Sequence, residues 1–101
     1  MEEFERLRPD ERELIGEWIR VDDQIDGDYT CKRIQFLTEE YLKELGKDWS
    51  GWETLFRDPT DGRYWERTYP HSDWHGGGPP ALFNLSEEEA REKYTKLFNC
   101  V

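Results

Sequence analysis

The sequence predicts an α+β domain, in which a small antiparallel sheet centred on a hairpin over residues 52–69 packs against a helix over residues 30–46. Residues 52–57 and 63–69 are rich in β-branched and aromatic side chains, and the Asp58-Pro59-Thr60-Asp61-Gly62 segment between them has the composition of a tight turn. Apolar side chains at spacings of three and four over residues 31–45 are typical of an amphipathic helix. A capped C-terminal helix completes the predicted fold.

The first part of the chain is mostly charged, and Pro9 interrupts any helix that begins near the N-terminus. We expect one short helical turn over residues 10–15, which Gly16 ends. Alternating side chains over residues 17–21 then predict a strand, and Asp26-Gly27 is expected to form the turn after it.

The predicted helix over residues 30–46 has a capping residue in Asp28 or Thr30, and Gly46 is suited to end it. The apolar run over residues 81–85 is expected to add a strand or to lie along the sheet edge.

The C-terminal helix is predicted from its first residues. Ser86 and Glu89 have the spacing of a capping box, in which each side chain bonds to the backbone of the other residue. Early acidic residues and later lysines also suit the helix dipole.

The size of the chain, 101 residues, supports one hydrophobic core, so we expect a single domain over residues 1–101. Aromatic residues make up 15% of the sequence. Because each buried ring removes about 150–250 Å² from water, they can supply core area that the few aliphatic residues lack.

The charge balance is strongly acidic, with 24 Asp and Glu against 14 Lys and Arg and a net charge of −10. Such a surface repels nucleic acid and anionic membranes and attracts basic proteins, although acidity can also serve solubility alone. No secretory signal and no apolar stretch of about 18 residues is evident. We therefore expect a cytoplasmic monomer with Cys31 and Cys100 as reduced thiols.

The aromatic segment GWETLFRDPTDGRYWERTYPHSDWHGGGPP, residues 51–80, resembles the immunity protein 27 family of bacterial polymorphic toxin systems. The residues Leu14-Ile15-Gly16-Glu17-Trp18 upstream and Ser86-Glu87-Glu88-Glu89-Ala90 with Tyr94 downstream extend the resemblance over roughly residues 14–94. It implies an antitoxin that binds a toxin encoded beside it. It carries over no site residue by position.

Two segments invite a metal interpretation, and neither has a full ligand set. His71 and His75 flank Asp73, but on a loop rich in Pro and Gly this spacing does not place both rings on one face, and no third strong ligand is evident. The aspartates of residues 22–28 resemble the start of an EF-hand loop, yet its twelfth position is Arg33 where a Glu is required. We expect no metal and no cofactor.

A catalytic interpretation would pair His71 with Asp58, Asp61 or Glu66 as acid and base. No nucleophile motif supports it, and the glycines of residues 76–78 lack the Lys-Ser/Thr that follows a nucleotide-binding loop. We therefore expect that the protein is not an enzyme.

The function that composition and resemblance favour is inhibition of a cognate toxin, of a basic nuclease type, by direct binding. Acidic side chains in turns project beyond a core and suit a cationic cleft. The expected partner-binding residues are Asp22, Asp23, Asp26, Asp28, Asp58 and Asp61. The alternatives left open are a small metal-dependent or hydrolytic enzyme that uses the 58–75 region, and an acidic adaptor module.

Overall fold

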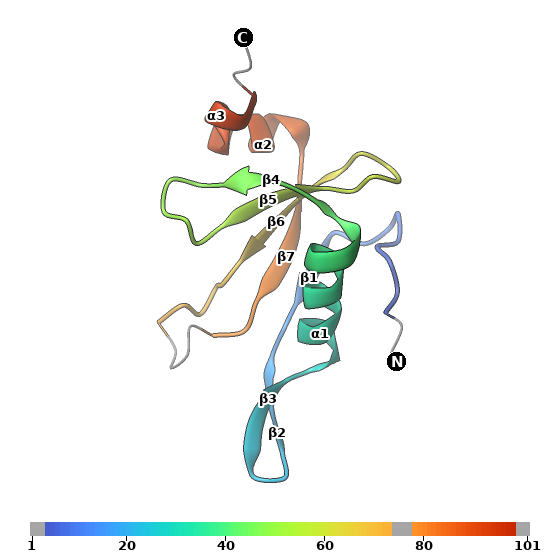
Figure 1. The fold of residues 1–101 in the computed structure, drawn as a ribbon, viewed down its shortest axis with the longest axis vertical. Helices are drawn as coiled ribbons and strands as arrows, with labels where there is room; N and C mark the ends of the chain where they lie inside the picture. Colours follow the sequence, from blue (N-terminus) through green and yellow to red (C-terminus); the bar gives the residue numbers. More distant parts are fainter. Residues whose placement is uncertain (1–3, 74–77, 99–101) are drawn as a thin grey trace.

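The fold is built on a five-stranded antiparallel sheet in the order β1-β7-β6-β5-β4, from which a two-stranded hairpin, β2-β3, projects (Figure 1). The computed structural model describes residues 4–73 and 78–98. The large sheet consists of β1 (Glu13–Ile15), β4 (Lys43–Lys47), β5 (Thr54–Arg57), β6 (Tyr64–Thr68) and β7 (Ala81–Leu85), and the hairpin of β2 (Trp18–Val21) and β3 (Gln24–Gly27). The helices are α1 (Tyr29–Phe36), its continuation as one π-helical turn η1 (Leu37–Tyr41), α2 (Glu87–Lys93) and α3 (Thr95–Phe98). The predicted α+β class is confirmed.

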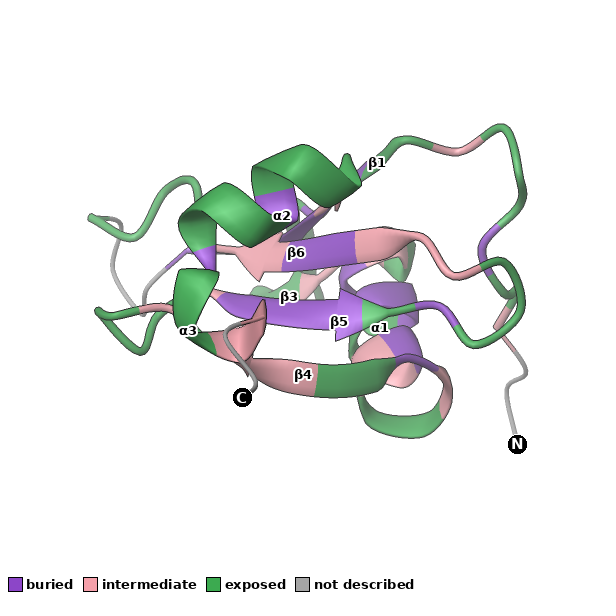
Figure 2. Ribbon diagram, turned by 90° about the horizontal axis from the view of Figure 1, so that it is seen from above, coloured by how far each residue is buried: buried purple, intermediate pink, exposed green. Residues whose placement is uncertain are grey.

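The predicted hairpin over residues 52–69 is confirmed and lies inside the sheet. β5 and β6 are antiparallel, with Phe56 opposite Trp65. In the turn, Gly62 has a φ of 78° and donates its backbone N–H to the Asp58 carbonyl at 2.8 Å. Trp65 is fully buried, whereas Tyr64 faces the opposite side and is half-buried. Buried residues follow β5 and β6 through the centre of the molecule (Figure 2).

Each face of the sheet is covered by a different helical element. On one face α1 and η1 contribute to a core of Leu7, Leu14, Ile34, Leu37, Leu42, Phe56, Trp65 and Leu82. On the other face α2 and α3 pack over a smaller core of Leu55, Ala90 and Tyr94, with half-buried Leu45, Tyr64, Leu85, Leu97 and Phe98 around it. The alternation of strand side chains between the two faces explains why neighbouring residues of β5 and β6 enter different cores.

The helix predicted over residues 30–46 ends at Tyr41, and residues 43–47 form the edge strand β4. Leu42 is extended, with φ −75° and ψ 147°, and β4 then pairs with β5 around a bulge between Glu44 and Gly46. Gly46 therefore does not end a helix. Its φ is 159°, and a Cβ there would lie 2.6 Å from Leu97 Cδ2, so the glycine allows α3 to approach the strand. Pairing with β5 outweighs the local helical pattern.

The helical turn predicted over residues 10–15 is also wrong. Residues 13–15 form β1, which pairs with β7 and buries Leu14. β7 is thus an interior strand between β1 and β6 and does not lie along the sheet edge. The capping box of Ser86 and Glu89 is confirmed at the start of α2. No helix in the described part of the chain is long and apolar enough to cross a membrane.

Candidate partner-binding surface

The β2-β3 hairpin turns at Asp22-Asp23, both of which have positive φ, 50° and 65°. Two consecutive residues with positive φ form the tight turn whose twist matches that of the two strands of a hairpin. Asp adopts positive φ more readily than most residues do. The turn predicted at Asp26-Gly27 is therefore wrong, because these residues belong to β3. Gly27 allows the base of the hairpin to lie close to α1, because a Cβ on this residue would lie 2.7 Å from the Cβ of Cys31.

The hairpin is exposed on both sides, and every residue of β2 is exposed. Six of the eight exposed large hydrophobic residues found in the described segments lie on the hairpin or beside it. They are Ile15, Trp18, Ile19, Val21, Ile25 and Tyr29. Sequence reasoning missed this surface, because alternation shows which side chains share a face of a strand but not whether a body covers that face.

Four of the predicted partner-binding residues lie on this element or directly after it. Asp22 and Asp23 form its tip. Asp26 lies on β3, where one carboxylate oxygen is 3.3 Å from Lys32 Nζ and the other accepts the N–H of Gly27. Asp28 is the capping residue of α1 and accepts the backbone N–H of Cys31 at 2.8 Å. The tip carboxylates are therefore the ones not used by the fold's described ion pairs and caps.

The other two predicted residues lie at the β5-β6 turn, away from the hairpin (Figure 1). Asp58 is 1% exposed, and its Oδ1 accepts from the Tyr41 hydroxyl and from the Thr60 N–H, both at 2.7 Å. Asp61 is exposed and bonds to Arg63, with 2.7 Å from Nε to Oδ2. Burial opposes ionisation of Asp61, but the hydrogen bonds from Arg63 outweigh it and lower its pKa. The structure thus does not bring all six carboxylates together, and Asp58 stabilises the turn from inside.

A cluster of arginine contacts fixes the segment before β1 to the body. Arg33 donates from Nη1 and Nη2 to the two carboxylate oxygens of Glu11 at 2.8 and 2.7 Å. It also donates from Nε to the Glu5 carbonyl and from Nη2 to the Arg6 carbonyl, both at 2.9 Å. Arg63 donates to the Glu11 carbonyl at 2.6 Å. The hydrogen bonds from Arg33 lower the pKa of Glu11 from 4.5 to about 2. The segment before β1 is therefore held against the body by these arginine side chains.

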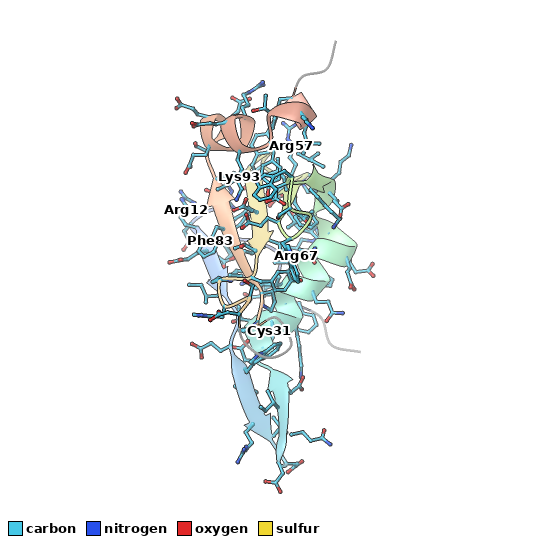
Figure 3. The ribbon with its side chains drawn as sticks, turned by 90° about the vertical axis from the view of Figure 1, so that its left-hand side faces the viewer. Arg12, Cys31, Arg57, Arg67, Phe83 and Lys93 are labelled. Atoms are coloured by element: carbon cyan, nitrogen blue, oxygen red, sulfur yellow. The ribbon has the colours of Figure 1, made fainter. Side chains whose placement is uncertain are left out.

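A groove of about 490 Å³ lies between α1, the base of the hairpin and the end of β6. Arg67 and Cys31 both line it (Figure 3). The Arg67 guanidinium lies over the rings of Phe56 and Tyr69, at 5.6 and 5.9 Å. Burial raises the pKa of the Cys31 thiol, which favours the unreactive protonated form. Cys100 lies outside the described residues.

The carboxylates that a catalytic role for His71 would need are engaged in the fold. Asp58 is bound to Tyr41, and Glu66 accepts from the Tyr94 hydroxyl and from Lys93 Nζ, both at 2.7 Å. His71 is exposed, and His75 lies outside the described residues. Within residues 4–73 and 78–98, no three His, Cys, Asp or Glu residues are grouped so that they could hold a metal ion.

Comparison with known protein families gives a match. The family model described as Immunity protein 27 matches residues 20–86, which include β3, α1, β4 to β7 and the tip of the hairpin. No curated protein and no solved structure matches the chain. The match covers about two thirds of the sequence, and its two ends fall in β2 and at the capping residue of α2.

Proposed function

The chain belongs to the immunity protein 27 family, and from this premise we propose that it binds a cognate toxin domain encoded nearby and keeps it inactive. Family membership supports the immunity role. The projecting hairpin, with carboxylates at its tip and uncovered apolar side chains behind them, is the observation that carries the proposed mode of action. Such a narrow element can enter a cleft that the wider body cannot enter.

The toxin in this proposal is a basic, nuclease-type protein. An enzyme that acts on nucleic acid presents cationic side chains to the phosphate backbone, and the same side chains attract an acidic inhibitor. This chain has a net charge of −10, and residues 17–28 hold five carboxylates against a single arginine. Complementary charge raises the rate of encounter and selects against partners of the wrong sign.

The contact residues that we propose are Asp22 and Asp23 first, followed by Asp26 and Asp28 at the base of the same element. Asp61 is accessible on a separate turn and would require a partner that reaches past the hairpin. Asp58 acts indirectly by stabilising that turn, since it is 1% exposed. We further propose that the inhibitor acts in the cytoplasm as a monomer, because copies of so acidic a chain repel one another.

The experiment is co-expression with the neighbouring toxin gene, followed by binding kinetics with the purified toxin. The wild-type protein should restore growth, and its association rate should fall steeply between about 50 and 500 mM salt, as expected for contacts that ions screen. The variant Asp22→Asn/Asp23→Asn keeps the turn, because Asn also tolerates positive φ. It should lower the association rate constant kon about three- to tenfold at low salt.

The matched control is Glu88→Gln/Glu92→Gln, which changes the net charge equally on exposed positions of α2. An equal reduction of kon in both variants would show that only overall charge matters and would remove the hairpin tip from the proposal. Failure of the wild-type protein to restore growth or to bind would overturn the toxin-inhibitor function itself.

A further inference from the structure

The β2-β3 hairpin carries apolar side chains on both of its faces. In an antiparallel pair, residues opposite each other point to the same side. Ile19 and Val21 are two residues apart on β2, so they share one face with their opposite residues Asp26 and Gln24. Trp18 and Arg20 share the other face with their opposite residues Gly27 and Ile25, so that face holds Trp18 and Ile25. A hairpin that lay on its own body would need only one apolar face.

The body covers only the base of the hairpin. There Gly27 lies against Cys31 of α1, whose Cβ is 2.7 Å from the position of a Cβ on the glycine. Toward the tip, Val21 is 46% exposed on one face and Ile25 is 70% exposed on the other. A two-stranded ribbon without cover on either face is only marginally stable in water. Both faces near the tip therefore offer area that a partner can bury.

We propose that the hairpin inserts tip first into the substrate cleft of the toxin, whose two walls are apolar and whose floor is cationic. The proposal rests on the toxin-inhibitor function given above and adds the geometry of the contact. The walls would contact Val21 and Ile19 on one side and Ile25 on the other, and the floor would receive Asp22 and Asp23. Four residues of extended strand span about 13 Å, which sets the depth of the insertion.

Charge decides between this occupant and a second copy of the chain. Two hairpins packed in the same direction would bring four tip carboxylates close to one another, and in any arrangement both chains carry a net charge of −10. A cleft built to bind phosphates offers the opposite sign at its floor. The apolar side chains should then govern how long the complex lasts, and the carboxylates how quickly it forms.

The first test compares dissociation rates from the purified toxin. Val21→Thr/Ile25→Thr keeps β-branched side chains, and so the strand, while it replaces apolar surface with hydroxyl groups. It should raise the dissociation rate constant koff about tenfold or more and leave the salt dependence of kon unchanged. The control is Trp49→Ser, which removes a 96% exposed ring from the connection between β4 and β5 and should leave koff unchanged. Circular dichroism checks that both variants fold.

The second test asks whether both faces are enclosed. A photocrosslinking phenylalanine analogue is placed at Val21 in one variant and at Ile25 in another, and each is irradiated with the toxin. Insertion into a cleft predicts toxin crosslinks from both positions, and a face-on contact predicts them from one. Toxin crosslinks from only one position, or crosslinks to another copy of this chain, would overturn the insertion while inhibition stands. So would a koff of Val21→Thr/Ile25→Thr equal to that of the wild type. A wild-type protein that does not bind the toxin would overturn the function beneath it.

Discussion

Neutralising Glu11 should remove a large part of the stability of the fold. The Glu11 and Arg33 side chains are only 10% and 8% exposed, and the two carboxylate oxygens each accept one N–H of the guanidinium. The variant Glu11→Gln keeps the size of the side chain but leaves the buried Arg33 charge without its counter-charge. Because this contact joins the N-terminal segment to α1, the attachment of that segment should weaken as well.

The magnitude follows from the pKa of Glu11, which falls from 4.5 to about 2 through the hydrogen bonds from Arg33. One pKa unit corresponds to about 1.4 kcal/mol, so the ionised carboxylate contributes at most about 3 kcal/mol to the free energy of unfolding. A carboxylate whose pKa is lower in the folded state contributes fully above its unfolded pKa. The contribution is then lost as pH falls from about 4.5 toward 2.

The assay is urea unfolding of the wild type and of Glu11→Gln at pH 7, 5 and 3, followed by circular dichroism. The difference in unfolding free energy should reach at most about 3 kcal/mol at pH 7, be nearly as large at pH 5 and be clearly smaller at pH 3. The control is Glu13→Gln, an exposed neighbour on β1, which should change stability by less than about 0.5 kcal/mol. A difference below about 1 kcal/mol at pH 7, or one that does not shrink at pH 3, would refute the assigned role of the ion pair.

Two further predictions test the core and the loop. Trp65→Ala should lower the unfolding free energy in urea by about 3–5 kcal/mol, because the side chain is fully buried. Tyr64→Ala should lower it clearly less, because Tyr64 is half-buried, and the reverse order would contradict the assignment of Trp65 to the main core. Elemental analysis of protein purified without added metal should find less than one equivalent of zinc, because His71 lies on a loop and Asp58 and Glu66 are hydrogen-bonded within the fold. Stoichiometric zinc that disappears in His71→Ala would contradict this prediction.

The parts of the fold that local chemistry decides could be predicted from the sequence. The 58–62 turn needed a residue that accepts positive φ at Gly62, and the capping box needed only Ser86 and Glu89 at their spacing. The end of the main helix could not be predicted, because Leu42 and Leu45 continue the helical spacing whereas the actual structure depends on pairing with β5. A strand added at a sheet edge is a long-range contact, and local spacing does not report it.

The candidate site was predicted only in part, for a similar reason. The acidic character of residues 22–28 is visible in the sequence, but the turn at Asp22-Asp23 is not, because Asp26-Gly27 is the stronger turn pair. Asp58 looked like a residue of an exposed tip, and its burial depends on Tyr41, a residue of η1 far away in the sequence. The structure shows that the apolar side chains of the hairpin are exposed, which the sequence alone does not show.

The pairing of β1 with β7 has a consequence for how the protein is made. β1 is synthesised early, yet its neighbour in the sheet follows after every other strand, with Glu13 opposite Phe83. The sheet edge at β1 therefore cannot close on the ribosome until β7 has emerged, and the slow search for this distant partner should set the folding rate. The β2-β3 hairpin, which needs only local contacts, can form in the nascent chain long before that. The element proposed to meet the toxin is thus ready early, while the body that supports it is completed last.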